Sequence, residues 1–218
     1  MPSRYLDSGR YIDSGAPDII AFAAKATRGA DTQRDKAIRI FEAVRDGISY
    51  DPYSVSLDPE DYVASAVSRR KSAYCVQKAI LLTAIARAAG IPAAVGFADV
   101  KNHLSSPKLL DLMGSDVFFY HGYTALYLDE RWIKVTPAFN QSLCERFGVR
   151  PLVFDGENDA LFHEYDMNDR LHMEYLRDRG SFVEPPMDDI LRSLVENYPR
   201  LAAFASKPRD AAFRDHTF

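Results

Sequence analysis

The sequence predicts an α+β domain in which a central, buried helix packs on an antiparallel sheet. Residues 76–89 are apolar on nearly every side, and a helix that is hydrophobic all round belongs in a protein interior. Residues 117–128 and 132–136 are rich in aromatic and β-branched side chains, which is the composition of strands. The polar turn Asp129-Glu130-Arg131 joins these segments, so together they predict a β-hairpin.

Shorter helices are expected before the central one. A turn or cap at residues 14–18 leads into an apolar segment that ends near Arg28. Residues 31–47 offer a second helix, with Asp31-Thr32 at its start and apolar residues at helical spacing. Residues 48–53 are expected to be extended or turning, because a residue before proline avoids the helical region. Another short helix is expected over residues 58–67.

The central helix is expected to end at Gly90, because the following Ile91-Pro92 prevents its continuation. Residues 93–100 predict a strand, and a loop that contains a helix is expected to follow as far as Met113. Beyond Pro137 the pattern weakens. A late helix is expected over residues 186–198, and from Lys207 the chain has the polar character of a frayed end.

The composition limits the classes of partner. The net charge of −4 over 218 residues provides no basic field, so neither nucleic acid nor an anionic membrane is expected as a partner. The sequence shows no repeat and no Pro/Gly/Ser-rich linker, which favours a single domain over residues 1–218. The sequence does not indicate an oligomeric state.

The first residues do not have the charged start and apolar stretch of a secretory signal, and no apolar run is long enough to span a bilayer. We therefore expect a cytoplasmic protein. In a reducing cytoplasm, Cys75 and Cys144 are expected to be free thiols rather than a disulfide.

Cys75 is a candidate nucleophile because a loop meets the central helix there. A thiol reacts as its thiolate, and a helix N-terminus or a neighbouring imidazole lowers the thiol pKa. Backbone amides at the same helix start could also stabilise an oxyanion. The position alone is equally compatible with a small buried core residue. Cys144 has no comparable setting and is interpreted as a core residue.

His121, at the start of the aromatic strand, is the candidate base, although a buried histidine can also be a hydrogen-bonded core residue. His103 competes with it from a loop. A tyrosine hydroxyl can help to hold an oxyanion, with aromatic packing as the alternative role; the candidates are Tyr50, Tyr74 and Tyr123.

An acidic stretch raises the alternative of a metal-dependent hydrolase. Its carboxylates from Asp155 to Asp169 lie near His163 and His172, but their spacing matches no recognised metal loop. We interpret this stretch as a solvated acidic loop and expect neither a metal nor a cofactor.

The order of these features resembles the transglutaminase-like superfamily, in particular its small bacterial-type domains, within the papain-like cysteine-nucleophile group. The resemblance covers roughly residues 35–140, about half the chain, and it implies a core at about 35–140 with a C-terminal extension at 141–218. Its most specific part is the Gly90-Ile91-Pro92 stretch, with a cysteine one helix earlier. The matching pieces are Tyr74-Cys75, Leu81 to Ala93, Gly96-Phe97, His121 to Leu128, Trp132 to Pro137 and, upstream, Ala37 to Tyr50.

The resemblance implies a transglutaminase-like, papain-like core and acyl transfer. Cys75 would attack an amide or ester carbonyl of a peptide, a protein or a small molecule, His121 would shuttle the proton, and a thioester would form. Water as the acceptor would give a peptidase or amidase, and an amine would give a transamidase. No cofactor is implied.

One position departs from the family pattern. Where the family usually has an aspartate that orients the histidine, this chain has Thr136, whose hydroxyl accepts a hydrogen bond but carries no charge. Asn140 is the alternative partner, as asparagine is in papain-like sites, and a third possibility is that neither residue acts. The departure supports a second hypothesis, a binding module that kept the fold without the activity.

Overall fold

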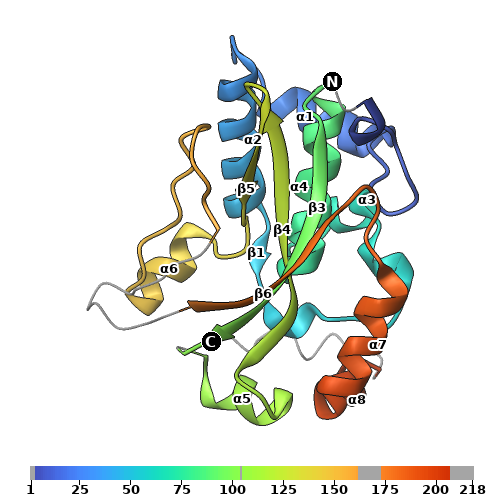
Figure 1. Ribbon diagram of the computed structural model, residues 1–218, viewed down its shortest axis with the longest axis vertical. Helices are drawn as coiled ribbons and strands as arrows, with labels where there is room; N and C mark the ends of the chain where they lie inside the picture. Colours follow the sequence, from blue (N-terminus) through green and yellow to red (C-terminus); the bar gives the residue numbers. More distant parts are fainter. Residues whose placement is uncertain (1–2, 104, 162–172, 207–218) are drawn as a thin grey trace.

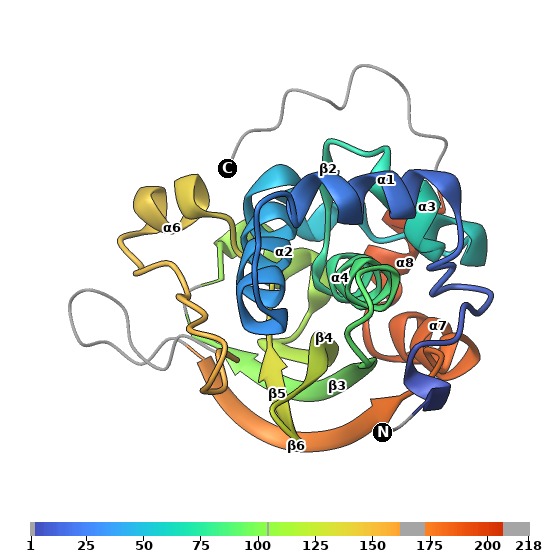
Figure 2. The same cartoon turned by 90° about the horizontal axis from the view of Figure 1, so that it is seen from above.

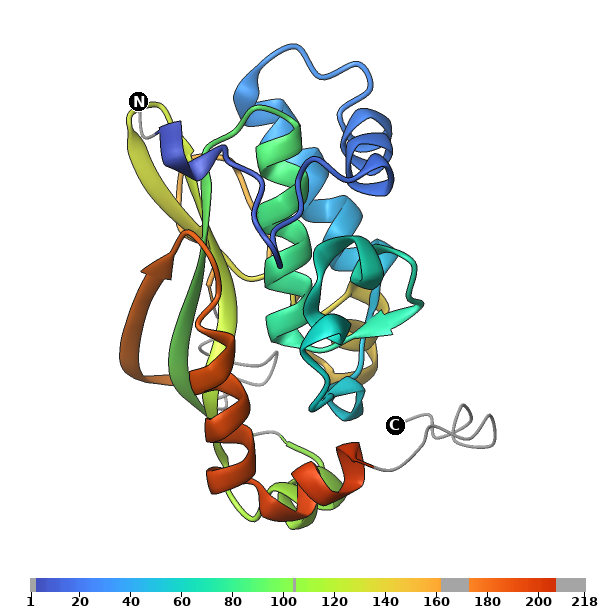
Figure 3. The same cartoon turned by 90° about the vertical axis from the view of Figure 1, so that its right-hand side faces the viewer.

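The structure is a computed structural model, and it describes residues 3–103, 105–161 and 173–206. Its elements form layers around one helix, α4, which spans Cys75–Ala88. A curved sheet covers one side of α4, and the N-terminal helices cover the other side (Figures 2 and 3). The central helix predicted from the sequence is therefore confirmed.

The burial of α4 follows from its sequence. All residues from Cys75 to Arg87 are buried, and the first turn is closed by Gln77, whose side-chain oxygen accepts the backbone N–H of Tyr74 at 3.2 Å. The helix ends before Gly90, which has a φ of 80°. Glycine adopts this left-handed conformation without strain, as the sequence predicts for a helix stop.

The described residues contain a four-stranded antiparallel sheet in the order β5-β4-β3-β6 (Figure 1). The predicted hairpin is present, and its turn at Asp129 and Glu130 has positive φ values of 46° and 64°, as twisted two-residue turns require. The α+β prediction is confirmed. The strands span Ala93–Asn102 (β3), Val117–Leu128 (β4), Arg131–Val135 (β5) and Met173–Phe182 (β6).

The other predicted helices are present close to their expected positions. They are α1 (Pro17–Ala26), α2 (Gln33–Gly47), α3 (Ala64–Ser68), α5 (Pro107–Met113) and α7 (Met187–Asn197), with 3₁₀ turns at Ser3–Tyr5, Pro52–Ser54 and Pro59–Tyr62. Two short parallel strands, β1 (Ser49–Tyr50) and β2 (Ser72–Ala73), place Tyr50 opposite Ala73, two residues before the cysteine.

The extension after residue 140 adds elements that the sequence analysis did not predict: β6, α6 (Gln141–Phe147) and α8 (Pro199–Ala205). Strand β6 pairs only with β3, at the edge of the sheet, and most of its side chains are not buried. It therefore lacks the alternation of apolar and polar residues on which strand prediction depends. None of the helices in the described part of the chain has the length and apolar character that crossing a bilayer requires.

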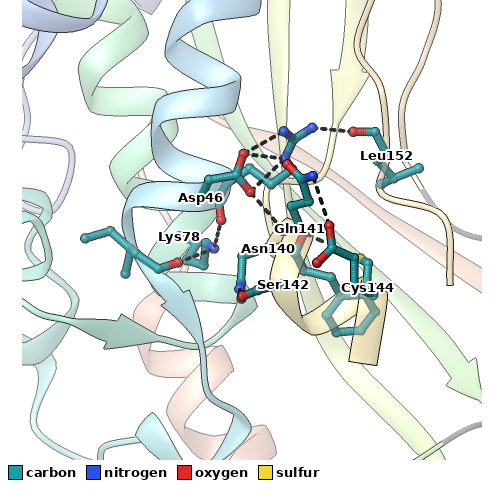
Figure 4. A network of polar contacts seen from close by, with 11 residues as sticks. Asp46, Lys78, Asn140, Gln141, Ser142, Cys144 and Leu152 are labelled. Carbon is teal, nitrogen blue, oxygen red and sulfur yellow. Dashed lines mark hydrogen bonds and ion pairs between the residues drawn. The ribbon is translucent and has the colours of Figure 1, made fainter. Parts of the chain in front are cut away.

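A buried lysine joins three of these elements (Figure 4). The Nζ of Lys78, on α4, donates hydrogen bonds to the carbonyls of Arg45 (2.8 Å) and Ile48 (2.5 Å), at the end of α2. Arg45 pairs with Asp46, and Asp46 accepts the backbone N–H of Gln141 at the start of α6. The last carbonyls of a helix have no partner within the helix, so Lys78 supplies the donors that the end of α2 needs.

We expect Lys78→Met to lower the free energy of unfolding by about 2–4 kcal/mol, because it leaves two buried carbonyls without donors. Urea denaturation at pH 7, followed by circular dichroism, measures the change. Lys25→Met, on the exposed surface of α1, is the matched control and should change stability by less than about 0.5 kcal/mol. Equal effects of the two substitutions would contradict this role for Lys78.

Burial lowers the pKa of Lys78 to about 7, from 10.5 in an exposed lysine. Between pH 7 and 10.5 the unfolded chain therefore binds more protons than the folded one, and stability rises with pH in this window. The same titrations should show that the wild type gains stability relative to Lys78→Met as the pH rises from 7.

Candidate active site

Cys75 is the first residue of α4, and its thiol is enclosed by the strand β4. Its relative exposure is 5%. Burial raises the pKa of the thiol to about 11, although Sγ accepts hydrogen bonds from the backbone N–H groups of Gly122 and Val76, which act in the opposite direction. The lowered pKa expected from a helix N-terminus is therefore not found, because desolvation of the thiolate outweighs the amide dipoles.

Gly122 lets β4 lie directly against the first turn of α4. A Cβ at this position would lie 2.9 Å from both the carbonyl oxygen of Cys75 and the Cα of Val76. Two residues on, the Oγ1 of Thr124 donates to the carbonyl of Ala79 at 3.0 Å. Gly122 and Thr124 therefore lie on the face of β4 that contacts α4. A side chain larger than hydrogen at residue 122 would separate the strand from the thiol.

His121 precedes Gly122 and pairs with Ala98 of β3. Because side chains alternate along a strand, and Gly122 and Thr124 face α4, His121 belongs to the opposite face of β4. Burial lowers the pKa of its imidazole to about 4. The ring is therefore neutral at neutral pH, which is the form that accepts a proton.

A β-bulge immediately before His121 is held by an ion pair. Tyr120 has a φ of 55°, a rare conformation for a bulky residue. Its backbone N–H donates to Oδ1 of Asp99 at 3.2 Å, and the same oxygen accepts Nε of Arg179 at 2.6 Å. The guanidinium of Arg179 also lies 4.0 Å from the centre of the Tyr120 ring. The sequence analysis missed Asp99 and Arg179. The available signal was Asp99 itself, a single carboxylate in the apolar strand predicted over residues 93–100.

Four buried tyrosines lie close enough to Cys75 to be affected by its charge. Burial is the main cause that raises the pKa of Tyr50, Tyr62, Tyr74 and Tyr198, and the proximity of Cys75 contributes less. The hydroxyl of Tyr74 donates to Tyr62 at 2.9 Å, so it already has a structural partner. Of the predicted tyrosines, Tyr50 and Tyr74 therefore lie at the site.

The third predicted tyrosine, Tyr123, lies elsewhere. It alternates to the face of β4 away from α4, and its hydroxyl contacts Asp178 and Ser181, each at 3.2 Å. The structure therefore does not bring Tyr123 to the thiol.

Thr136 and Asn140 occupy different settings. Thr136 follows Val135, which lies opposite Thr124, so continued alternation places Thr136 on the same face as His121. Its Oγ1 is buried and has no hydrogen-bond partner in the described part of the chain. Asn140 is already engaged, because its Oδ1 accepts the backbone N–H of Tyr50 at 2.9 Å and its Nδ2 donates to Ser142 at 2.8 Å.

The remaining candidates occupy other settings. His103 is exposed and lies 3.4 Å from Glu174, and Cys144 is buried on α6. Among the described residues, no cluster of histidine, cysteine and carboxylate side chains could hold a metal ion. The proposed metal ligands His163 and His172 lie outside the described residues.

A model of the transglutaminase-like superfamily matches residues 20–137, which is more than half of the sequence. The chain belongs to the transglutaminase-like superfamily. Membership supports a cysteine-based enzyme at the level of the family. The matched region includes Cys75, His121 and Thr136. A search of curated proteins found no match.

Two solved structures resemble the chain at low identity. A Cytophaga hutchinsonii protein described as a "Putative Cysteine Protease" is 17% identical, with a TM-score of 0.48 over 82% of this chain and 52% of its own. A Parabacteroides distasonis "putative protease" is 18% identical, with a TM-score of 0.39 over 63% of this chain and 28% of its own. The chain thus spans about half the length of the first and less of the second.

We expect Gly122→Ala to lower the free energy of unfolding by about 1–3 kcal/mol, because the added methyl overlaps the backbone of α4. Gly47→Ala is the control: that glycine is exposed at the end of α2, and nothing lies within 4 Å of an added Cβ. It should be neutral or stabilise by up to about 1 kcal/mol. Urea denaturation compares the two, and a neutral Gly122→Ala would disprove the close contact.

Proposed function

We propose that this protein is a cysteine-dependent acyl-transfer enzyme that forms a thioester on Cys75. The observation that carries the proposal is the buried thiol at the start of α4, in contact with the backbone N–H that follows His121. The substrate is an amide or ester of a peptide, a protein or a small molecule. The scheme requires neither a metal nor a cofactor.

The position of the sulfur supports His121 as the base. The Gly122 N–H that acts on the sulfur belongs to the residue directly after His121, and a backbone N–H of a strand lies close to the plane of the sheet. In our proposal the His121 ring, which comes from the opposite face, reaches the thiol around the edge of the strand. Since the thiol pKa is about 11 and the imidazole pKa about 4, the resting pair is a neutral thiol and a neutral imidazole.

Acylation then proceeds by general base catalysis. His121 takes the thiol proton while Sγ forms a bond to the carbonyl carbon, and the carbonyl electrons move to its oxygen. Backbone N–H groups at the start of α4 stabilise this oxyanion. When the intermediate collapses, the bond to the leaving amine or alcohol breaks, and His121 returns the proton to the leaving group.

Water or an amine completes the cycle. The acceptor attacks the thioester carbonyl and gives a proton to His121, which passes it to the departing sulfur. Water makes the protein a peptidase or amidase, and an amine makes it a transamidase. Both reactions share the acylation of Cys75, so acylation is the step that tests the proposal.

We assign the orientation of His121 to Thr136 rather than to Asn140. The buried Oγ1 of Thr136 is available on the same face of the sheet, whereas the side chain of Asn140 is engaged by Tyr50 and Ser142. A hydroxyl stabilises an imidazolium less than a carboxylate does. The alternative function, a non-catalytic binding module, is favoured by this missing charge and by the raised pKa of the thiol.

We expect an activated ester to acylate Cys75 but not Cys144, and Cys75→Ala to show no acylation. Mass spectrometry of the intact and digested protein locates the acyl group. The acylation rate should decrease when the pH is lowered below about 4, because His121 becomes protonated there. Above that pH the acylation rate should be nearly constant until the thiol ionises near pH 11.

A rate that rises tenfold per pH unit through neutrality would instead indicate a free thiolate without a base. Absence of acylation in a folded protein would favour the binding module.

The pair Thr136 and Asn140 gives a separate prediction. Thr136→Val should lower the acylation rate about 3- to 10-fold, the value of one hydrogen bond. Thr136→Asp should raise the pKa of His121, which moves the acidic limb of the rate profile to higher pH. Asn140→Ala is the comparison, and it should leave that limb in place. A shift of the limb in Asn140→Ala alone would reverse the assignment.

A further inference from the structure

An apolar cavity of about 70 Å³ lies near the site, between β1, the ends of β3 and β4, and the helices α5 and α6. A water-sized group needs roughly 10–15 Å³ of cavity volume on this measure. This cavity therefore has room for about five methylene-sized groups. Its walls are mainly aromatic and aliphatic: Tyr50, Leu109, Phe118, Phe139, Leu143 and Val149.

Tyr50 connects this cavity to the thiol. It lines the cavity, it lies opposite Ala73 two residues before the nucleophile, and proximity to Cys75 contributes to its raised pKa. Its ring meets Phe139 edge to face with 4.8 Å between centroids, and its backbone N–H is held by Asn140. Two consecutive residues, Phe139 and Asn140, therefore hold the side chain and the backbone of Tyr50 in place.

The cavity also contains an unused polar atom. The Oγ of Ser105 is buried and has no hydrogen-bond partner within the described residues. The neighbouring Ser106 is engaged, because it accepts the backbone N–H of Leu109 at the start of α5. Buried hydroxyl groups are normally satisfied, so Ser105 is suited to the backbone polar group of a bound molecule. Burial keeps the Cys144 thiol in this wall neutral, with a pKa of about 11.

We propose that this cavity binds the apolar side chain of the acyl group that Cys75 receives. The preferred substrates are then peptides or acyl amino acids with a leucine- or methionine-sized side chain on the acyl side of the reacting bond. The size and apolar lining select the side chain, and Tyr50 keeps it beside the thiol. This inference rests on the proposed function only for its chemical step, because binding can be measured without catalysis.

The binding arm uses Cys75→Ala, which cannot react, with N-acetyl-leucinamide and N-acetyl-glycinamide as probes followed by NMR titration. The leucine probe should bind at least about tenfold more tightly than the glycine probe, as expected for burying one large aliphatic side chain. Equal affinities, or no binding of the leucine probe, would overturn the inference.

A filled cavity supplies the matched control. Val149→Phe places a ring where the ligand side chain would lie, whereas Val153→Phe makes the same change at a residue that is 79% exposed. The first should abolish the preference for leucine, and the second should retain it. Leu143→Phe fills the same cavity from α6 and replaces the first variant if thermal melting shows that Val149→Phe is unfolded.

The reaction arm compares acetyl-leucine and acetyl-glycine esters on the wild-type chain. If both acylate Cys75 equally fast, the proposed function stands and the pocket assignment is wrong. If neither acylates Cys75 but the leucine probe still binds Cys75→Ala selectively, the pocket assignment stands and the enzymatic proposal fails.

Discussion

The contact between β4 and the first turn of α4 is the constraint on which the site depends. At Gly122 the strand backbone approaches the helix so closely that a Cβ would overlap it. This approach places a strand N–H on the sulfur of Cys75 and fixes the position of His121, the preceding residue. The sheet and the N-terminal helices enclose α4 from both sides, so the contact cannot relax without exposing a helix that is buried from Cys75 to Arg87 (Figure 3).

The same enclosure determines the charge state of the two groups that we propose to react, the thiol of Cys75 and the imidazole of His121. Burial disfavours ions, so it raises the pKa of the thiol and lowers that of the imidazole. An enzyme built in this way transfers the proton during attack instead of storing a thiolate beforehand. Thr136 agrees with this arrangement, because a carboxylate there would favour the imidazolium that a neutral pair avoids. In the proposed enzyme the missing acid and the shifted pKa values therefore fit one mechanism, whereas in a binding module the same two features would reflect the loss of activity.

The sequence predicted the core because its local patterns and its packing agree. The all-round apolar helix, the aromatic hairpin and Gly90 each have one favourable structure, and the order of Cys75 and His121 indicated the site. What the sequence could not provide depends on contacts between distant segments. Strand β6 has exposed side chains and is defined by its hydrogen bonds to β3, and Arg179 reaches Asp99 across that pairing. Tyr123 lies on the far face because of strand alternation, which its aromatic character does not reveal.

Asn140 shows how the extension can be coupled to the chemistry. It is the last residue of the predicted core and the N-cap of α6, and its side chain holds the backbone of Tyr50. Tyr50 lines the apolar cavity and lies close enough to Cys75 for the thiol to affect its pKa, and α6 supplies other residues of the same lining. Lys78, one turn after Cys75, holds the end of α2 beside the same helix through the carbonyls of Arg45 and Ile48, and Asp46 in that part of α2 accepts the backbone N–H of Gln141 on α6 (Figure 4). A substitution in α6 would therefore reshape the cavity without touching the nucleophile, so selectivity and reactivity can vary separately in this architecture.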